Sequence, residues 1–461
     1  MPRSMQGRVP RQPPLAWAIA LVMGLAPHVA ADPIDPAPAL GADSERAAEP
    51  LPDSPQLKQA AQWYRRGDLD QTLTWLRKAT AADPALSPPE LLLGNMLFSE
   101  ERVGQAVDYF ERAARQYPSD PEPHLIFGDL ALRRRRICDA EVQYSRAETL
   151  ASTLDESNAR RAGMVERAAM GLAQVAEARH DLTGAITRYR SLLEQHPDLA
   201  RAHFRLGNVL YAHGDQEGAL AELRLASQLL TNAPSPLLTL AQLAQQAGKL
   251  DEADNWMQRA VDESSDDASI LLAMARWQLE MRQAPQKAAT WLEKARLQSP
   301  ESIEVDYLSA LVAWAQGELS RAEETLESVV LQQPDHLAAS NALAAVLAEQ
   351  NDPKRLRRAQ ELIQLTASTN QRSTETLAVL GWVAFKAGNL ELADRNLRPI
   401  LQDPSASRDS RYYLSRTLFQ RGQIDAALRL LRDTVASTGP FIHMREARRW
   451  MQDLVKPEKS N

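Results

Sequence analysis

The stretch FRLGNVLYAHGDQEGALAEL, Phe204–Leu223, has a helical pattern and yet contains three glycines. A glycine inside a helix costs up to about 1 kcal/mol relative to alanine, so each one needs a local reason. We predict that Gly207 lies where two helices cross closely, because a larger side chain would push them apart. Gly214 is predicted to form the turn between the helices, and Gly218 to begin the second helix, where a fraying end tolerates it.

The same spacing recurs along the chain. An alanine near the beginning of each second helix returns roughly every 34 residues. It stands at Ala106, Ala140, Ala185, Ala219, Ala253, Ala288, Ala322, Ala359, Ala393 and Ala427, with Thr72 in the first unit. Twelve positions earlier most units have a small residue: Ala60, Gly94, Gly128, Ala173, Gly207, Ala241, Ala310, Ala344, Gly381 and Ser415. Unit seven departs from the pattern, with Arg276 at this place.

This pattern resembles the tetratricopeptide repeat family from about Leu57 to Leu454. The resemblance implies an all-α fold: a superhelical solenoid of about eleven helix-turn-helix repeats with a C-terminal capping helix. Burial of apolar surface also favours this arrangement. One pair of short helices cannot bury its apolar side, whereas stacked pairs can.

The chain divides into five segments. Residues 1–31 are predicted to be a signal peptide, since Arg3, Arg8 and Arg11 precede a short apolar run, Leu15–Ala26, and a cleavage site before Asp32. Residues 32–55 form a Pro-rich flexible leader. The solenoid follows over 56–439, with an insertion near 150–164, then a capping helix over 440–455 and a tail over 456–461. We expect an exported, periplasmic protein in preference to an inner-membrane anchored one.

The composition and the motifs of the chain exclude several classes of function. The net charge of −7 argues against a nucleic-acid partner, and a single cysteine, Cys138, excludes an internal disulfide. No nucleotide-binding, zinc-protease or serine-hydrolase motif is present, so we expect no enzyme and no cofactor. Four histidines fall between His180 and His213, but their repeat positions differ, so we expect surface histidines and no metal site.

The resemblance also implies where a partner would bind, because in this family the first helix of each unit lines a concave groove. The side chains expected to face it are Asn95, Phe98, Phe204, Asn208, Tyr211, Trp277, Tyr307, Trp314, Trp382, Phe385, Tyr412 and Phe419. Only 5% of residues are aromatic, so this set is a concentration on one side, and large aromatics are typical anchors. Packing between neighbouring first helices is the alternative reason for some of them.

Two basic regions each allow two interpretations. Arg133–Arg136 lie in the turn of repeat three and fit either an anionic ligand or a solvated turn. From Arg408 to Asn461 there are eleven Lys or Arg and six Asp or Glu. This basic excess favours an acidic partner, or it is a variation in composition without a function.

We therefore predict a non-enzymatic interaction scaffold in the cell envelope. Its partners would be proteins of the envelope machinery, in secretion or in surface polysaccharide assembly. The first alternative is a carbohydrate-binding protein in which Trp277, Trp314 and Trp382 stack on sugars. The others are an enzyme of unrecognised chemistry and a membrane-tethered assembly factor that keeps Leu15–Ala26 as an anchor.

Overall fold

The structure is a computed structural model that describes residues 54–155, 157–230, 234–369, 373–404 and 406–455. The predicted signal peptide, nearly all of the predicted leader and the predicted tail lie outside these residues. No helix within the described ranges is long and apolar enough to cross a membrane.

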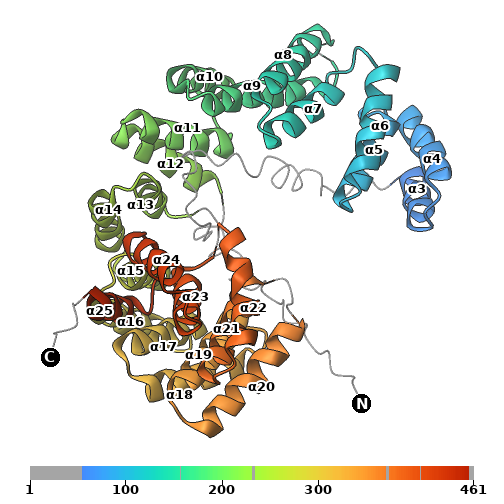
Figure 1. Cartoon of the computed structure of the whole chain (residues 1–461). Helices are drawn as coiled ribbons and strands as arrows, with labels where there is room; N and C mark the ends of the chain where they lie inside the picture. The colour runs from blue at the N-terminus through green and yellow to red at the C-terminus, as the bar shows by residue number, and fades with distance from the viewer. Residues whose placement is uncertain (1–53, 156, 231–233, 370–372, 405, 456–461) are drawn as a thin grey trace, which may run out of the picture. The chain divides into compact units, whose positions relative to one another are not determined.

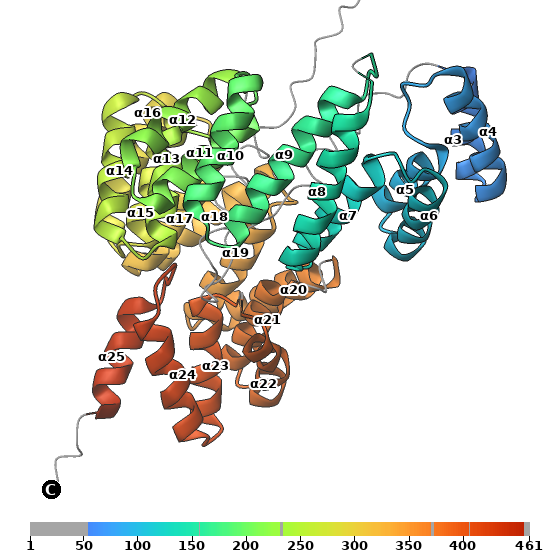
Figure 2. The same cartoon turned by 90° about the horizontal axis from the view of Figure 1, so that it is seen from above.

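The described residues form eleven consecutive pairs of antiparallel helices and one further helix (Figures 1 and 2). The first helices of the pairs are α3 (Pro55–Arg65), α5 (Pro89–Ser99), α7 (Glu122–Arg133), α9 (Arg161–Ala178), α11 (Ala200–His213), α13 (Pro236–Gln246), α15 (Ala268–Glu280), α17 (Ile303–Gln316), α19 (Leu337–Glu349), α21 (Thr374–Lys386) and α23 (Arg408–Gln420). The second helices are α4 (Leu69–Ala82), α6 (Val103–Gln116), α8 (Ile137–Thr153), α10 (Leu182–Gln195), α12 (Gln216–Leu229), α14 (Leu250–Glu263), α16 (Pro285–Gln298), α18 (Leu319–Gln332), α20 (Pro353–Thr369), α22 (Leu390–Leu397) and α24 (Ile424–Ala436). A 3₁₀ helix, Arg398–Gln402, follows α22, and α25 (Met444–Val455) is the last helix. The prediction of an all-α fold with about eleven repeats is confirmed.

The three glycines of the opening stretch have the predicted roles. A Cβ on Gly207 would lie 3.1 Å from the carbonyl oxygen of Ala219 and 2.8 Å from Leu223, so α11 and α12 do nearly touch there. Gly214 has φ +97°, a left-handed conformation that favours glycine. Gly218 lies in the first turn of α12 and donates its N–H to Asp215 at 2.9 Å.

The turn between paired helices uses the same left-handed geometry without glycine in five repeats. The residues with positive φ there are Glu101, Arg135, His180, Gln283 and Asn351. A non-glycine residue in this region is strained, which a sequence search for turn glycines cannot detect.

The insertion near 150–164 lengthens two helices. Helix α8 has 17 residues and α9 has 18, whereas most other second helices have 14. The Tyr144 ring on α8 packs against both neighbours, because a Cβ on Gly128 of α7 or Gly171 of α9 would meet it at 2.6 or 2.4 Å. Glycine on both flanking helices therefore admits one buried aromatic ring between them.

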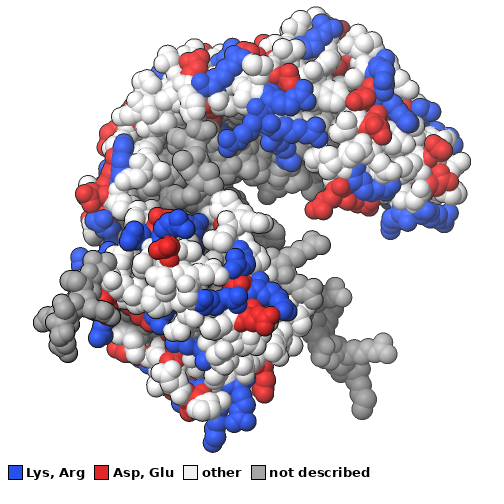
Figure 3. Space-filling model, viewed as in Figure 1, with Lys and Arg blue, Asp and Glu red and all other residues white. Residues whose placement is uncertain are grey.

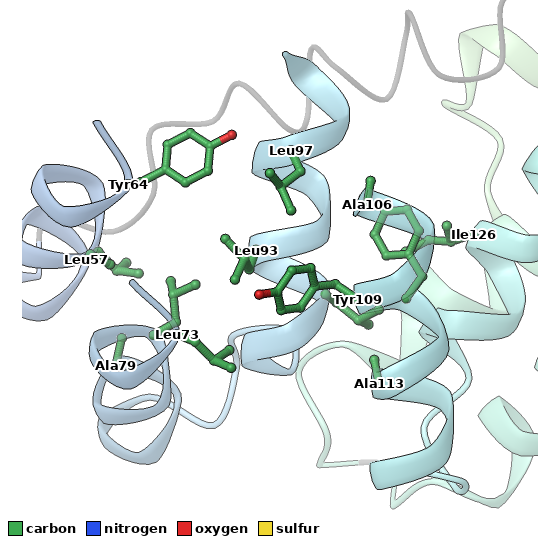
Figure 4. Close-up of a cluster of buried hydrophobic side chains, with 14 residues drawn as sticks. Leu57, Tyr64, Leu73, Ala79, Leu93, Leu97, Ala106, Tyr109, Ala113 and Ile126 are labelled. Carbon is green, nitrogen blue, oxygen red and sulfur yellow. The ribbon is translucent and has the colours of Figure 1, made fainter. Parts of the chain in front are cut away.

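The helices form two compact units, and the boundary between them in the sequence lies at the beginning of α13. The N-terminal unit contains α3 to α12 and the C-terminal unit α13 to α25. Each is held by apolar side chains between stacked helices. Figure 4 shows one such core, in which Leu73 of α4 and Leu93 and Leu97 of α5 meet Tyr109 of α6.

Helix α25 packs against the last repeat. Trp450 lies edge-on to Tyr412 and Phe419 of α23, and Glu446 pairs with Arg416 at 3.3 Å. The residues Gly439–His443, which we call the return segment, leave the end of α24 and run back toward earlier repeats before α25 begins (Figure 2).

We predict that Gly171→Ala destabilises the N-terminal unit, because the new methyl group would overlap the fixed Tyr144 ring. Overpacking of this kind costs about 1–3 kcal/mol. Chemical denaturation of the full chain would measure it. The matched control is Gly163→Ala in the same helix, where a Cβ meets nothing within 4 Å. Equal stability of the two variants would contradict the packing account.

Candidate functional site

The first helices of the N-terminal unit are joined by buried acids that arginines cover. Asp129 of α7 is only 4% exposed and accepts a hydrogen bond from the Tyr144 hydroxyl at 2.5 Å. Arg167 of α9, in the next repeat, forms an ion pair with the same carboxylate. Burial and the Asp129 charge raise the pKa of Tyr144, so the hydroxyl stays a donor.

The same arrangement recurs one repeat later. Glu177 of α9 is 2% exposed, accepts a hydrogen bond from Tyr189 of α10 and pairs with Arg205 of α11 at 3.2 Å. Burial raises the pKa of Glu177, while Arg205 and Tyr189 act in the opposite direction. Each arginine thus comes from the repeat that follows its acid.

This side of the unit, formed by α7, α9 and α11, carries an excess of positive charge, and we call it the arginine face. Arg201 interacts electrostatically with Tyr144 and Tyr189, and Arg133 with Asp129, so both lie near the two ion pairs. Four guanidinium groups (Arg133, Arg167, Arg201 and Arg205) therefore surround two carboxylates. Figure 3 shows the gathering of blue side chains over α7 and α9.

Two polar groups on the helices of this face are buried without a hydrogen-bond partner in the described part of the chain. They are Nε2 of Gln174 on α9 and Oδ1 of Asn208 on α11. Gln174 is 8% exposed, and Phe204 beside Asn208 is half-buried. Both atoms have almost no solvent exposure, so they are unsatisfied polar groups inside the unit.

The C-terminal unit has a different centre, a carboxylate held by two tryptophans. Glu349, the last residue of α19, accepts the indole N–H of Trp314 at 2.8 Å and that of Trp382 at 3.1 Å. These donors come from α17 and α21, the first helices on either side of α19. Three successive first helices therefore fix one buried anion.

His443 of the return segment lies against this carboxylate. Its Nε2 is 2.8 Å from Glu349, its Nδ1 is in contact with Asp409, and its ring stacks on Tyr412 at 5.2 Å. We call the six surrounding residues the His443 pocket: Trp314, Glu349, Trp382, Asp409, Tyr412 and Tyr413.

The charges of this pocket fix the protonation state of His443. Burial alone would lower the pKa of His443, but Glu349 and Asp409 raise it to about 10. Burial would likewise raise the pKa of Glu349, but the charge and hydrogen bond of His443 and the hydrogen bond of Trp314 bring it below its ordinary value. The pocket thus holds an imidazolium ion between two carboxylates at neutral pH.

The residues predicted to face a groove differ in exposure. Asn95 is exposed, and Phe98, Phe204, Asn208, Tyr307, Phe385 and Phe419 are half-buried. Tyr211, Trp277, Trp314, Trp382 and Tyr412 are buried. The structure brings Trp314, Trp382 and Tyr412 together around His443, with Phe385 stacked on Trp382. Their role toward a partner stays a prediction.

The three tryptophans proposed to stack on sugars are 5%, 9% and 1% exposed for Trp277, Trp314 and Trp382. Each indole N–H is already used, the first by Asp254 and the other two by Glu349. In this arrangement none of the three offers an open ring face to a carbohydrate.

The expectation of surface histidines is wrong for His203. It is 7% exposed, and its ring bonds Glu222 at 2.6 Å and the carbonyl oxygen of Pro197 at 3.0 Å. Among the described residues no group of three or more His, Cys, Asp or Glu side chains is placed to hold a metal ion.

Sequence reasoning missed the charged members of both sites. Asp129, Glu177, Glu349 and Asp409 occupy first helices, where charged residues read as solvated positions. A signal was present in the placement of two of them, because Asp129 and Glu177 occupy the same repeat positions as Asn208 and Tyr211. His443 had no local signal, because its partners are 94 and 34 residues away.

Comparison with known proteins identifies the repeat. Models described as tetratricopeptide repeat match residues 91–155, 167–234, 234–259, 279–347 and 408–438, which together exceed half of the chain. The chain belongs to the tetratricopeptide repeat family. Arrays of this repeat serve protein–protein interaction, so the chain is an interaction scaffold by family, and its stacked helix pairs are tetratricopeptide solenoid units.

Individual relatives are more distant. The chain is 29% identical over 201 residues to the TPR repeat-containing protein PA4667 of Pseudomonas aeruginosa, over 44% of this chain and 34% of that protein. This chain therefore aligns with only about a third of the length of that relative. Yeast Tom70 matches with TM-score 0.37 and 15% identity, over 86% of this chain and 94% of that chain. A tetratricopeptide repeat protein from Parabacteroides merdae matches with TM-score 0.40 and 15% identity, over 55% and 98%.

We predict that the unfolding free energy of the C-terminal unit falls as pH rises from 7 to 10. The pKa of His443 is about 10 in the folded chain against 6.5 for a free histidine. A group whose pKa is higher in the folded than in the unfolded chain stabilises the fold fully at pH values below its unfolded pKa. This stabilisation is lost as the pH rises through its folded pKa. Thermal unfolding of the wild-type chain and of His443→Gln at several pH values would test this. The variant should lose this part of the pH dependence, and parallel curves for the two proteins would contradict it.

Proposed function

We propose that the arginine face of the N-terminal unit binds an extended, acidic segment of a protein partner. The observation that carries this proposal is the gathering of Arg133, Arg167, Arg201 and Arg205 near the buried acids Asp129 and Glu177. Guanidinium groups select carboxylates, which they bind through charge-assisted hydrogen bonds. Half-buried Phe204 on α11 offers an apolar contact next to them.

The acids beneath the arginines serve to orient them. Asp129 and Glu177 are buried and keep Arg167 and Arg205 in fixed positions through ion pairs. An arginine fixed in this way loses less side-chain entropy on binding a carboxylate. Because the arginines outnumber the buried acids, the face remains cationic after these pairs are formed.

We further propose that the chain acts outside the cytoplasm, with partners in envelope machinery for secretion or surface polysaccharide assembly. The support is the sequence of residues 1–31, with its basic end, apolar run and small residues before Asp32. N-terminal sequencing of the protein from fractionated cells is the direct test. A periplasmic product beginning at Asp32 is expected, and an intact N-terminus in the cytoplasmic fraction would overturn the proposal.

The acidic-partner proposal predicts a charge-selective site. An alternating Glu-Gly decapeptide should bind the full chain more tightly than Ser-Gly or Lys-Gly decapeptides, with an affinity that falls as salt rises. Arg133→Ser/Arg201→Ser should weaken binding about fivefold to thirtyfold, because two partly screened charge contacts contribute roughly 0.5–1 kcal/mol each. Fluorescence anisotropy with an uncharged label would measure these affinities.

The matched control is Arg188→Ser/Arg190→Ser, which removes the same charge from exposed positions of α10. This variant should bind as the wild type does. Equal weakening in both double variants would mean that the peptide senses only net charge, and the proposed face would then be wrong.

A further inference from the structure

The return segment is bound in the C-terminal unit as a peptide ligand would be. The carbonyl oxygen of Gly439 accepts from Arg408 at 2.8 Å and from Gln283 at 3.4 Å. The backbone N–H groups of Ile442 and His443 each donate to the Asp409 carboxylate at 3.1 Å. Recognition thus involves backbone groups at both ends of the segment.

Two side chains of the segment point inward and one lies between them at the edge. Phe441 is 2% exposed, lies edge-on to Tyr412 and lies 4.7 Å from the Arg408 guanidinium. His443 is 5% exposed within its pocket, and Ile442 is half-buried. The segment forms a turn here, since the N–H of Met444 bonds the carbonyl oxygen of Phe441 at 3.4 Å and the carbonyl oxygen of His443 accepts from Ala447 of α25 at 2.8 Å.

The carboxylate of the pocket has hydrogen-bond partners besides its occupant. Both oxygens of Glu349 are held by indole N–H groups, one from Trp314 and one from Trp382. If His443 left, the carboxylate would keep these two hydrogen bonds. Removal of Glu349 would be different, because the imidazolium would lose one of its two counter-charges in a buried place. The carboxylate is thus a preorganised receptor and His443 its replaceable partner.

The return segment does not close tightly over the repeats behind it. A cavity of about 140 Å³ separates Phe441, Ile442, Met444, Arg445 and Arg448 from Leu279, Gln283, Pro285 and Ala315. Gln283, which bonds Gly439, has the strained φ of +52°. The helices on both sides have their own anchors: Arg408 bonds carbonyl groups at the end of α24, and Trp450 holds α25 on α23. The five-residue segment therefore lies between two helices that each have contacts of their own.

We infer that the His443 pocket is a binding site for a segment that turns as Phe441–Met444 do, with an aromatic residue followed two positions later by a cationic side chain. The chain's own Phe441 and His443 fill this site in cis. The C-terminal unit is then closed to such a segment from another molecule until its own return segment opens. This site lies in the C-terminal unit, and the inference is independent of the arginine face.

A peptide in trans tests the site directly. The probe is the decapeptide STGPFIHMRE, residues 437–446, added to the full chain. His443→Ser should bind it at least tenfold more tightly than the wild type, because the cis ligand no longer fills the pocket. The same peptide with serine in place of histidine should lose at least tenfold in affinity for the variant.

The matched control is His213→Ser, which makes the same change at an exposed position of the N-terminal unit and should behave as the wild type. Circular dichroism shows whether each variant is folded. If folded His443→Ser fails to bind the peptide, or binds both peptides equally, the inference is overturned.

Hydrogen exchange of the wild-type chain gives a second test that needs no variant. If the return segment opens locally, the amides of Ile442 and His443 should exchange at least tenfold faster than the slowest amides of α23. Exchange of all of them at the same rate would show that the segment leaves only on global unfolding. It would then be a permanent part of the core, and the inference would be wrong.

Discussion

Every element of this chain depends on one constraint: a pair of short helices buries its apolar sides only against another pair. Small residues make the contact possible. Without a side chain at Gly207, α11 approaches the carbonyl of Ala219, and glycines at 128 and 171 leave room for the Tyr144 ring between α7 and α9. The stack therefore extends by repetition, and each repeat presents its first helix beside the first helices of its neighbours.

The two units stabilise their buried carboxylates in different ways. Both place acids on their first helices where neighbouring repeats bury them. In the N-terminal unit an arginine of the next repeat pairs with Asp129 and another with Glu177. In the C-terminal unit the Glu349 carboxylate is solvated by two indole N–H groups and completed by an imidazolium from the return segment. The N-terminal unit thus pairs its buried acids with arginines, whereas the C-terminal unit pairs Glu349 with a histidine.

The repeat could be predicted from sequence because its determinants are local. Spacing located the helix crossings and the turn at Gly214, since each depends on residues within one unit. The left-handed residue Gln283 was not predictable, because its turn contains neither glycine nor asparagine. The His443 pocket was not predictable either, because Gly439 and Gln283 are 156 residues apart and no repeat rule relates them.

The tryptophans show how much of a residue's role can be predicted from its position in the repeat. Trp314 and Trp382 do lie on first helices, on the side that the repeat assigns to a binding groove. Position alone could not tell that they would be 9% and 1% exposed, because His443, which lies against both, comes from beyond the last repeat. Tyr413 of α23 also stacks on Trp382. Their indole N–H groups point at a carboxylate, an arrangement that apolar packing does not require. Aromatic residues that only fill space do not require a buried anion beside them. Here the Glu349 carboxylate lies beside both tryptophans, and in our proposal it is the group that a cationic segment recognises.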